Sequence, residues 1–268
     1  MTTPTRAVDI VRVSMGERVM ARDRAAAEEP LAIRIEGEPF AVIMRTPGAD
    51  RDLAAGFLFA ERLVRRADDV ASIAHCADAA EHENTVDVTL VDPAAAKRAR
   101  RQRRDLTATA SCGVCGRQSI EDLACDLVRI DDDLVVPPRT IARLPARLRD
   151  SQRAFDETGG LHAAGIFSVD GVLLDIAEDV GRHNAVDKVI GRAVLHRQVP
   201  LSRALLCVSG RTSFEIVQKA ALAGIPVLAA VSAPSSLAID LAERTGITLI
   251  GFIRGDSFNV YAGPQRVA

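Results

Sequence analysis

The residues best suited to chemistry are two cysteines separated by two residues, Cys112 and Cys115, in the segment SCGVCGR. A thiol becomes an effective nucleophile when its pKa falls, and the free N–H groups of a helix N-terminus lower that pKa. We expect a short amphipathic helix to begin near Arg117. The glycines next to the cysteines carry no side chains, so they leave the pair accessible. The spacing therefore predicts a reactive cysteine loop that meets the active site of another protein.

Two other interpretations of this pair stay open. A structural zinc site needs two further ligands at matched spacing, and only His75, Cys76 and Cys125 lie near it in the sequence, without a second C-x-x-C. A thioredoxin-like dithiol would lie at the first helix of a βαβ unit, whereas this pair lies in a linker between two modules. We expect Cys76, Cys125 and Cys207 to be structural, with Cys207 inside an apolar strand.

Three further segments each follow a predicted strand. EDVGRHNAVDK contains Arg182 and His183, SGRTSFE contains Arg211, and GFIRGDSFNVY contains Arg254 in a predicted turn. Helix N-termini and arginine side chains bind phosphate groups, and the carboxyl ends of strands in an open α/β sheet form the ligand-binding edge. We expect the three segments to share that edge and to hold a large, nucleotide-like anion, although an ordinary helix cap explains the first segment equally well.

The elements that must position these residues are most regular after Gly160. Strands are predicted at residues 162–169, 172–177, 204–208, 226–231 and 247–253. Helices are predicted at residues 184–197, 213–223 and 235–244, with Thr212 and Glu215 at capping-box spacing. This alternation predicts an α/β fold, namely a cytidine-deaminase-like, mostly parallel sheet with helices on both faces. The zinc-binding H-x-E and P-C-x-x-C motifs of deaminases are missing from the sequence.

In the first half of the chain, the sequence predicts a tail and a small unit of short strands and one helix. Residues 1–28 predict a polar tail with one short strand near residues 9–13. Residues 29–106 predict a small α+β unit with a hairpin (LAIRI, FAVIM), a helix after Asp52 and a strand at 85–91. Its basic end, residues 97–104, is predicted to be an exposed connection. Residues 107–138 then hold the cysteine loop and a linker helix, and residues 139–268 the α/β domain, which opens with a helix at about 144–157.

Composition excludes several classes of protein. Of 268 residues, 48% are hydrophobic and 26% charged, which is typical of a globular chain. The 34 basic and 36 acidic residues nearly cancel, and aromatic residues are only 3%, so we expect no nucleic-acid partner. The longest apolar stretch, residues 220–233, is too short to span a bilayer. We expect a cytoplasmic protein without a membrane partner.

Five motifs occur in a fixed order: SCGVCG, TGGLHAAG, EDVGRHNAVDKVIG, SGRTSFEIVQKAALAGIPVLAAVSAPSSLA and FIRGDSFNVYAG. Over residues 29–263 the chain thereby resembles the FdhD family, the formate dehydrogenase accessory sulfurtransferases. The resemblance implies a sulfur carrier that takes sulfane sulfur from a cysteine desulfurase. It would deliver this sulfur to the molybdenum of Mo-bis(molybdopterin guanine dinucleotide), the molybdenum cofactor, before that cofactor is inserted into formate dehydrogenase.

The resemblance also implies roles for individual residues. Cys112 would carry the persulfide, with Cys115 as its partner in exchange and no catalytic metal. The cofactor-binding stretch carries over to Phe252, Ile253, Arg254, Gly255, Asp256 and Ser257. The pyrophosphate groups of the acceptor suit Arg182, His183 and Arg211. A homodimer is also implied. The alternative class is a zinc-stabilised nucleotide-binding module without transfer chemistry, and a disulfide oxidoreductase is a third.

Overall fold

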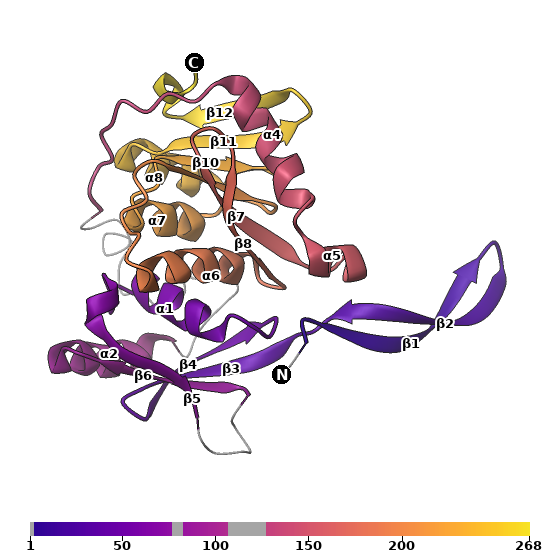
Figure 1. The fold of residues 1–268 in the computed structure, drawn as a ribbon, viewed down its shortest axis with the longest axis horizontal. Coiled ribbons are helices and arrows are strands. Elements are labelled where there is room, and N and C mark those ends of the chain that lie inside the picture. The colour runs from indigo at the N-terminus through magenta and orange to yellow at the C-terminus, as the bar shows by residue number, and fades with distance from the viewer. Residues whose placement is uncertain (1–2, 77–82, 107–126) are drawn as a thin grey trace.

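The computed structural model describes residues 3–76, 83–106 and 127–268. Within these ranges the strands form three sheets, of two, four and six strands. Figure 1 shows the six-stranded sheet with its helices above, the four-stranded sheet below, and the two-stranded ribbon projecting to one side. Among the helices of the described ranges, none is both long enough and apolar enough to cross a membrane.

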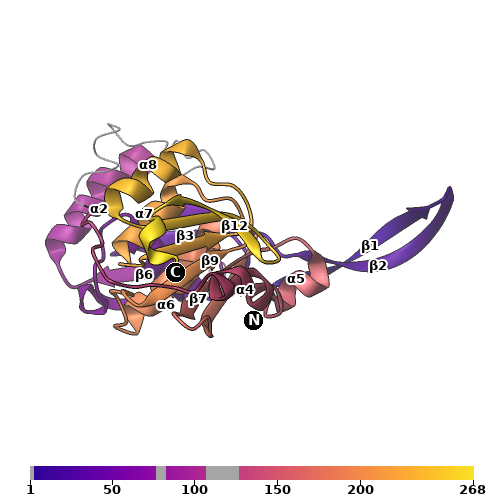
Figure 2. The same ribbon diagram turned by 90° about the horizontal axis from the view of Figure 1, so that it is seen from above.

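The six-stranded sheet forms the α/β half of the chain, with strand order β12-β11-β10-β9-β7-β8. Its strands are β7 (His162–Ser168), β8 (Leu173–Asp179), β9 (Ala204–Val208), β10 (Val227–Ala230), β11 (Thr248–Arg254) and β12 (Ser257–Ala262). One face packs on α6 (Arg182–Leu195), α7 (Phe214–Leu222) and α8 (Ser236–Thr245), and the other on α4 (Pro138–Arg149). Figure 2 shows α7 and α8 on one side of the sheet and α4 on the other. The predicted α/β class, with helices on both faces, is confirmed.

The direction of the strands differs from the prediction in one respect. Pairs β9–β10 and β10–β11 are parallel, but β7–β8, β7–β9 and β11–β12 are antiparallel. The sheet is therefore mixed and not mostly parallel, because two short turns return the chain to a neighbouring strand. Since β7 runs opposite to both neighbours, β8, β9, β10 and β11 all end at the edge where β7 begins.

Two local predictions about helices are wrong. The helix expected at residues 144–157 is two helices, α4 and α5 (Arg153–Thr158), of which α4 begins at Pro138 because proline suits the first helical turn. Gly159 ends α5 at φ 65°, as its position predicts. The capping box does not form, since Ser213 is the N-cap residue of α7 and its side chain accepts no capping bond.

The four-stranded sheet has the order β4-β3-β6-β5 and belongs to the small unit. Its elements are β3 (Glu29–Ile35), β4 (Glu38–Arg45), α1 (Asp50–Ala60), the 3₁₀ turn η1 (Ala67–Asp69), β5 (Val70–His75), β6 (Thr85–Leu90) and α2 (Pro93–Leu106). The hairpin, the helix and the strand β6 are confirmed, while β5 was not predicted. Residues 97–104, expected as an exposed connection, are part of α2, where Lys97 and Arg98 are exposed as predicted. Ala95 and Ala99 bury the other side of this helix, which is rich in good helix formers.

The N-terminal residues form a ribbon where a tail with one short strand was expected, and the strand predicted near residues 9–13 lies within β1. Strands β1 (Thr5–Ser14) and β2 (Glu17–Ala26) pair antiparallel along their whole length. Met15 and Gly16 have φ of 49° and 90°, as a tight two-residue turn requires. At the base, Arg24 Nε lies 2.7 Å from Glu157 Oε2 of α5. Nearly all ribbon side chains are exposed, so the sequence offers no apolar face that would have revealed the strands.

Helices α1 and α6 join the small unit to the α/β half. They cross at two glycines: a Cβ on Gly56 would lie 2.0 Å from the carbonyl oxygen of Asp187, and one on Gly191 would lie 1.9 Å from that of Asp52. Side chains of both units also pack into one continuous hydrophobic cluster. The two sheets therefore share a core through this close helix crossing.

We expect Gly56→Ala to lower the free energy of unfolding by about 2–3 kcal/mol, because the new methyl group meets backbone that cannot move cheaply. The measurement is urea-induced unfolding. Gly160→Ala is the matched control, because a Cβ there would meet nothing closer than 3.5 Å. Equal stability of the two variants would contradict the close crossing.

Candidate functional site

The edge at which β8, β9, β10 and β11 end carries all three predicted segments. The first begins α6 after β8, the second links β9 to α7, and the third is the turn between β11 and β12. The expectation that they share one edge is confirmed. That they bind a common ligand stays a prediction.

The first two segments are in direct contact. His183 Nε2 lies 2.9 Å from Ser213 Oγ, which ties the start of α6 to the start of α7. Gly210 fits between His162 and Arg182, because a Cβ there would lie 3.3 Å from His162 Nδ1 and 3.5 Å from Arg182 Cβ. The structure thus brings Arg182 and His183 beside the loop that carries Arg211, and it adds His162, which was expected only to open a strand.

The third segment lies further along the same edge. It is connected through the loop after β10: Phe252 N donates to Ser232 O at 3.3 Å, and Thr212 N donates to Ala233 O at 3.2 Å. Phe252 is 39% exposed at φ 53°, and Ile253 is buried. The turn itself is exposed and comprises Arg254, Gly255, Asp256 and Ser257. The predicted arginines therefore line the edge as a row rather than a single cluster.

Two buried donors at the contacting segments have no partner within the described part of the chain. They are Nε of Arg182 and the hydroxyl of Thr212, a residue that is only 1% exposed. A buried donor without an acceptor is costly. Arg211 is exposed beside them. Together with the start of α7, these groups suit an anion with several acceptor oxygens.

A chain of titratable side chains runs inward from the edge between α6 and α7, beginning at His183. Glu215 Oε2 lies 3.7 Å from His183 Nε2, and Lys219 Nζ lies 2.8 Å from Glu215 Oε1 and 2.5 Å from Asp187 Oδ2. Burial raises the pKa of Asp187 to about 7. Burial opposes the charge on Lys219, but the attraction of Asp187 and Glu215 outweighs it and raises the pKa of Lys219. Lys219 is therefore a permanent cation beneath the edge.

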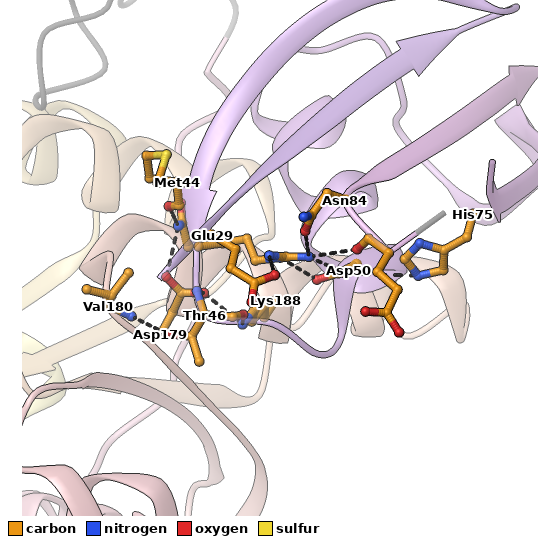
Figure 3. A network of polar contacts seen from close by, with 12 residues as sticks. Glu29, Met44, Thr46, Asp50, His75, Asn84, Asp179, Val180 and Lys188 are labelled. Atoms are coloured by element: carbon orange, nitrogen blue, oxygen red, sulfur yellow. Dashed lines mark hydrogen bonds and ion pairs between the residues drawn. The ribbon is translucent and has the colours of Figure 1, made fainter. Parts of the chain in front are cut away.

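A second buried network holds the loop before α6 (Figure 3). The carboxylate of Asp179 accepts from Gly181 N at 2.8 Å, Asn184 Nδ2 at 2.9 Å and Thr46 N at 3.1 Å, and it pairs with Lys188 Nζ at 2.7 Å. Lys188 Nζ also donates to Thr46 O at 2.9 Å. The loop that presents Arg182 and His183 is thus fixed to the small unit.

The network continues through Arg45, the residue before Thr46, whose side chain is fully buried. Its guanidinium bonds to Asp50 Oδ1 and Asn84 Oδ1 at 3.0 and 3.1 Å, and it lies 3.5 Å from Glu29 Oε2 (Figure 3). These partners come from β3, from α1 and from the residue before β6. The end of β4, next to the residue that bonds to Asp179, is therefore fixed by polar contacts to three other segments.

Sequence reasoning missed Asp179, Lys188, Lys219 and His162 as parts of the site. One observation could have found two of them: the chain has three lysines, and Lys188 and Lys219 lie in helices whose other residues are largely apolar. A lysine in such a helix predicts a buried ion pair. Nothing in the pattern indicated that His162 would meet Arg182.

Cys112 and Cys115 lie outside the described residues, as do Cys125 and most of the helix expected after Arg117. Burial raises the pKa of the Cys207 thiol to about 12, which makes it unreactive, as a structural role requires. Across residues 3–76, 83–106 and 127–268, no three His, Cys, Asp or Glu side chains are grouped to hold a metal ion. Zinc binding by the cysteine pair stays an alternative.

We expect Asp179→Asn to lower the free energy of unfolding by about 3–5 kcal/mol, because it leaves Lys188 buried without a counter-ion. Chemical denaturation measures the change. The matched control is Asp9→Asn in the exposed Asp9–Arg22 pair, which should cost less than about 0.5 kcal/mol. A similar small cost at Asp179 would show that the network does not hold the loop.

His183 should make stability pH-dependent, because burial lowers its pKa from 6.5 to about 4. The folded protein keeps His183 neutral, so its contribution is complete above pH 6.5 and is lost as the pH falls towards 4. Between pH 7 and pH 5, the wild type should lose about 2 kcal/mol more unfolding free energy than His183→Gln. Parallel pH profiles would contradict the buried, neutral histidine.

Comparison with known proteins places this geometry in context. The sequence model of the FdhD/NarQ family matches residues 26–268. The protein named Sulfur carrier protein FdhD from Streptomyces coelicolor is 51% identical over 265 residues, which cover 97% of this chain and 94% of that protein. Its namesake from Mycobacterium tuberculosis is 47% identical over 267 residues, 96% of each chain. A crystal structure described as a formate dehydrogenase accessory protein from Desulfotalea psychrophila aligns with TM-score 0.78 and 26% identity over 99% of this chain and 100% of that one.

Proposed function

This chain belongs to the FdhD/NarQ family, and from that premise we propose that it is a sulfur carrier that serves formate dehydrogenase. The observation that carries the proposal is the strand-end edge, where buried donors of Arg182 and Thr212 have no partner in the described part of the chain and suit an anion. The chain is also 51% identical to a protein named as a sulfur carrier. We propose Cys112 as the persulfide carrier, a cysteine desulfurase as the donor, and Mo-bis(molybdopterin guanine dinucleotide) as the acceptor substrate.

Loading is a thiol exchange without net oxidation. The Cys112 thiolate attacks the outer sulfur of the desulfurase persulfide, and a new S–S bond forms. The S–S bond of the donor breaks, and the desulfurase leaves as a thiolate. Cys112 then carries one sulfane sulfur.

Delivery as sulfide needs two electrons, which the second cysteine supplies. The Cys115 thiolate attacks Sγ of Cys112, the bond to the outer sulfur breaks, and hydrosulfide leaves as a Cys112–Cys115 disulfide forms. Hydrosulfide with one added proton replaces an oxygen ligand of molybdenum, which departs as water. A cellular dithiol reductant then returns the disulfide to two thiols.

The acceptor substrate carries two pyrophosphate groups, and the edge offers matching donors. We propose that Arg182, His183 and Arg211 bind phosphate near the starts of α6 and α7. The turn residues Phe252, Ile253, Arg254, Gly255, Asp256 and Ser257 would contact the acceptor further along the row. Because the row is long, one extended ligand can reach both parts of it.

We expect Cys112→Ser to abolish sulfur loading. Intact-protein mass spectrometry after incubation with desulfurase and cysteine should show one added sulfur atom on the wild type and none on the variant, since serine forms no persulfide. Cys76→Ser is the matched control and should still load, because Cys76 has no role in the exchange. Loading that persists on Cys112→Ser, or stoichiometric zinc in the purified wild type, would refute the proposal.

A further inference from the structure

Helix α2 carries the densest positive charge in the sequence, and the proposed function gives it no role. Six of the eight residues 97–104 are basic and none is acidic. Removing these six from the 34 basic residues of the chain leaves 28, against 36 acidic residues. The helix is therefore a positive region in a chain that is otherwise acidic, and such a region attracts acidic partners.

One side of α2 is buried and the opposite side carries charge. Ala95 and Ala99 are 3% and 2% exposed and belong to the core, and α2 packs against β4 and β6. Lys97 and Arg98 are exposed, and the ion pair of Arg98 with Asp92 is loose at 3.8 Å. The positions that share the side away from the two alanines, by helical spacing, are 97, 100, 101 and 104. An acidic surface can thus lie along a helix about 21 Å long.

The helix ends close to the cysteine pair along the chain. Cys112 is the sixth residue after Leu106, the last residue of α2. An extended residue spans at most about 3.6 Å, so Cys112 can lie no further than roughly 22 Å from the helix end. A protein bound on α2 is thereby held where its own sulfur can reach Cys112.

Helix α2 lies far from the edge that is proposed to hold the acceptor. Figure 1 and Figure 2 both show α2 at one end of the molecule and α5, which leads into β7 at that edge, at the other. The two positive regions therefore face different partners. The acceptor belongs to the edge, which leaves the sulfur donor for α2. The helix also has no aromatic residue on which a nucleic-acid base could stack.

We propose that α2 is the docking surface for the sulfur donor, a protein that presents acidic side chains beside its persulfide-bearing cysteine. The proposal rests on the proposed function, which supplies that donor, a cysteine desulfurase. Opposite charges speed the encounter and orient the donor, so that its persulfide arrives at the end of α2 that leads to Cys112. The bonds formed and broken are those of the loading step, and no further reactant is needed.

The test is the rate of sulfur loading on the full chain, followed by intact-protein mass spectrometry with cysteine and the cysteine desulfurase of the same organism. We expect the α2 variant, Lys97→Glu with Arg98→Glu, to lower the second-order rate constant at least about tenfold at low salt. Raising the salt from about 50 to about 300 mM should slow the wild type severalfold and the α2 variant much less. Arg12→Glu with Arg18→Glu, two exposed arginines of the ribbon, changes the net charge equally and should load like the wild type.

Cysteine persulfide is the second donor, because it carries sulfane sulfur but no protein surface. It should load the wild type and the α2 variant at equal rates. Equal slowing with both donors would show that α2 acts on the reactivity of Cys112 and would overturn the docking surface. So would desulfurase loading at the wild-type rate in an α2 variant that unfolds cooperatively. If the charge reversal prevents folding, Lys97→Gln with Arg98→Gln keeps good helix formers and should lower the constant about threefold.

Failure of the proposed function gives a different result. A wild type that gains sulfur from neither donor refutes the sulfur carrier itself, whereas a loss confined to the α2 variant and the desulfurase supports the docking surface. Binding of a fluorescent RNA oligonucleotide to the wild type but not to the α2 variant, with equal loading of both by the desulfurase, would assign α2 to nucleic acid and overturn the proposal.

Discussion

The buried carboxylate of Asp179 is the constraint on which the site depends. A charge removed from water is tolerated only when its lone pairs are satisfied, and here the donors come from α6, from the loop before it and from the small unit. The stability of each of these segments therefore depends on the position of the other two. The position of the loop that presents Arg182 is in this way set by residues far from it in the sequence, including Thr46 and, behind it, Arg45.

The two halves of the chain act as one body for a second reason. The glycine crossing of α1 and α6 lets the helix backbones touch, so the small unit packs against the helix that begins at the edge. The edge in turn receives side chains from both faces of the large sheet. The chain of titratable side chains from His183 to Lys219 lies on one face, a cleft lined by Gln152 and His162 lies on the other, and Gly210 leaves room where they meet.

Much of the large domain was predictable, because its inner strands β7, β9, β10 and β11 are largely buried on both faces. Two of its helices, α5 and α8, also end at Gly159 and Gly246, where local turn chemistry decides. The shared edge followed from the order of strands and helices. The ribbon and β5 were missed since neither shows a clear apolar face. The partners of Asp179 could not be predicted either, because Thr46 lies more than a hundred residues away and no periodicity links the two. The reactive cysteines rest on their spacing and on motif resemblance, since they lie outside the described residues.

The scarcity of lysine has a practical consequence. Lys188 and Lys219 are both 2% exposed and held in ion pairs, so Lys97 on α2 is the one lysine whose amine is open to solvent. Amine-reactive dyes and surface-coupling reagents attach to exposed, unprotonated amines, so among the side chains they would modify Lys97 alone, in addition to the α-amino group of the chain. A fluorophore or tether on a side chain would thus sit at one defined point on α2, without first replacing a residue.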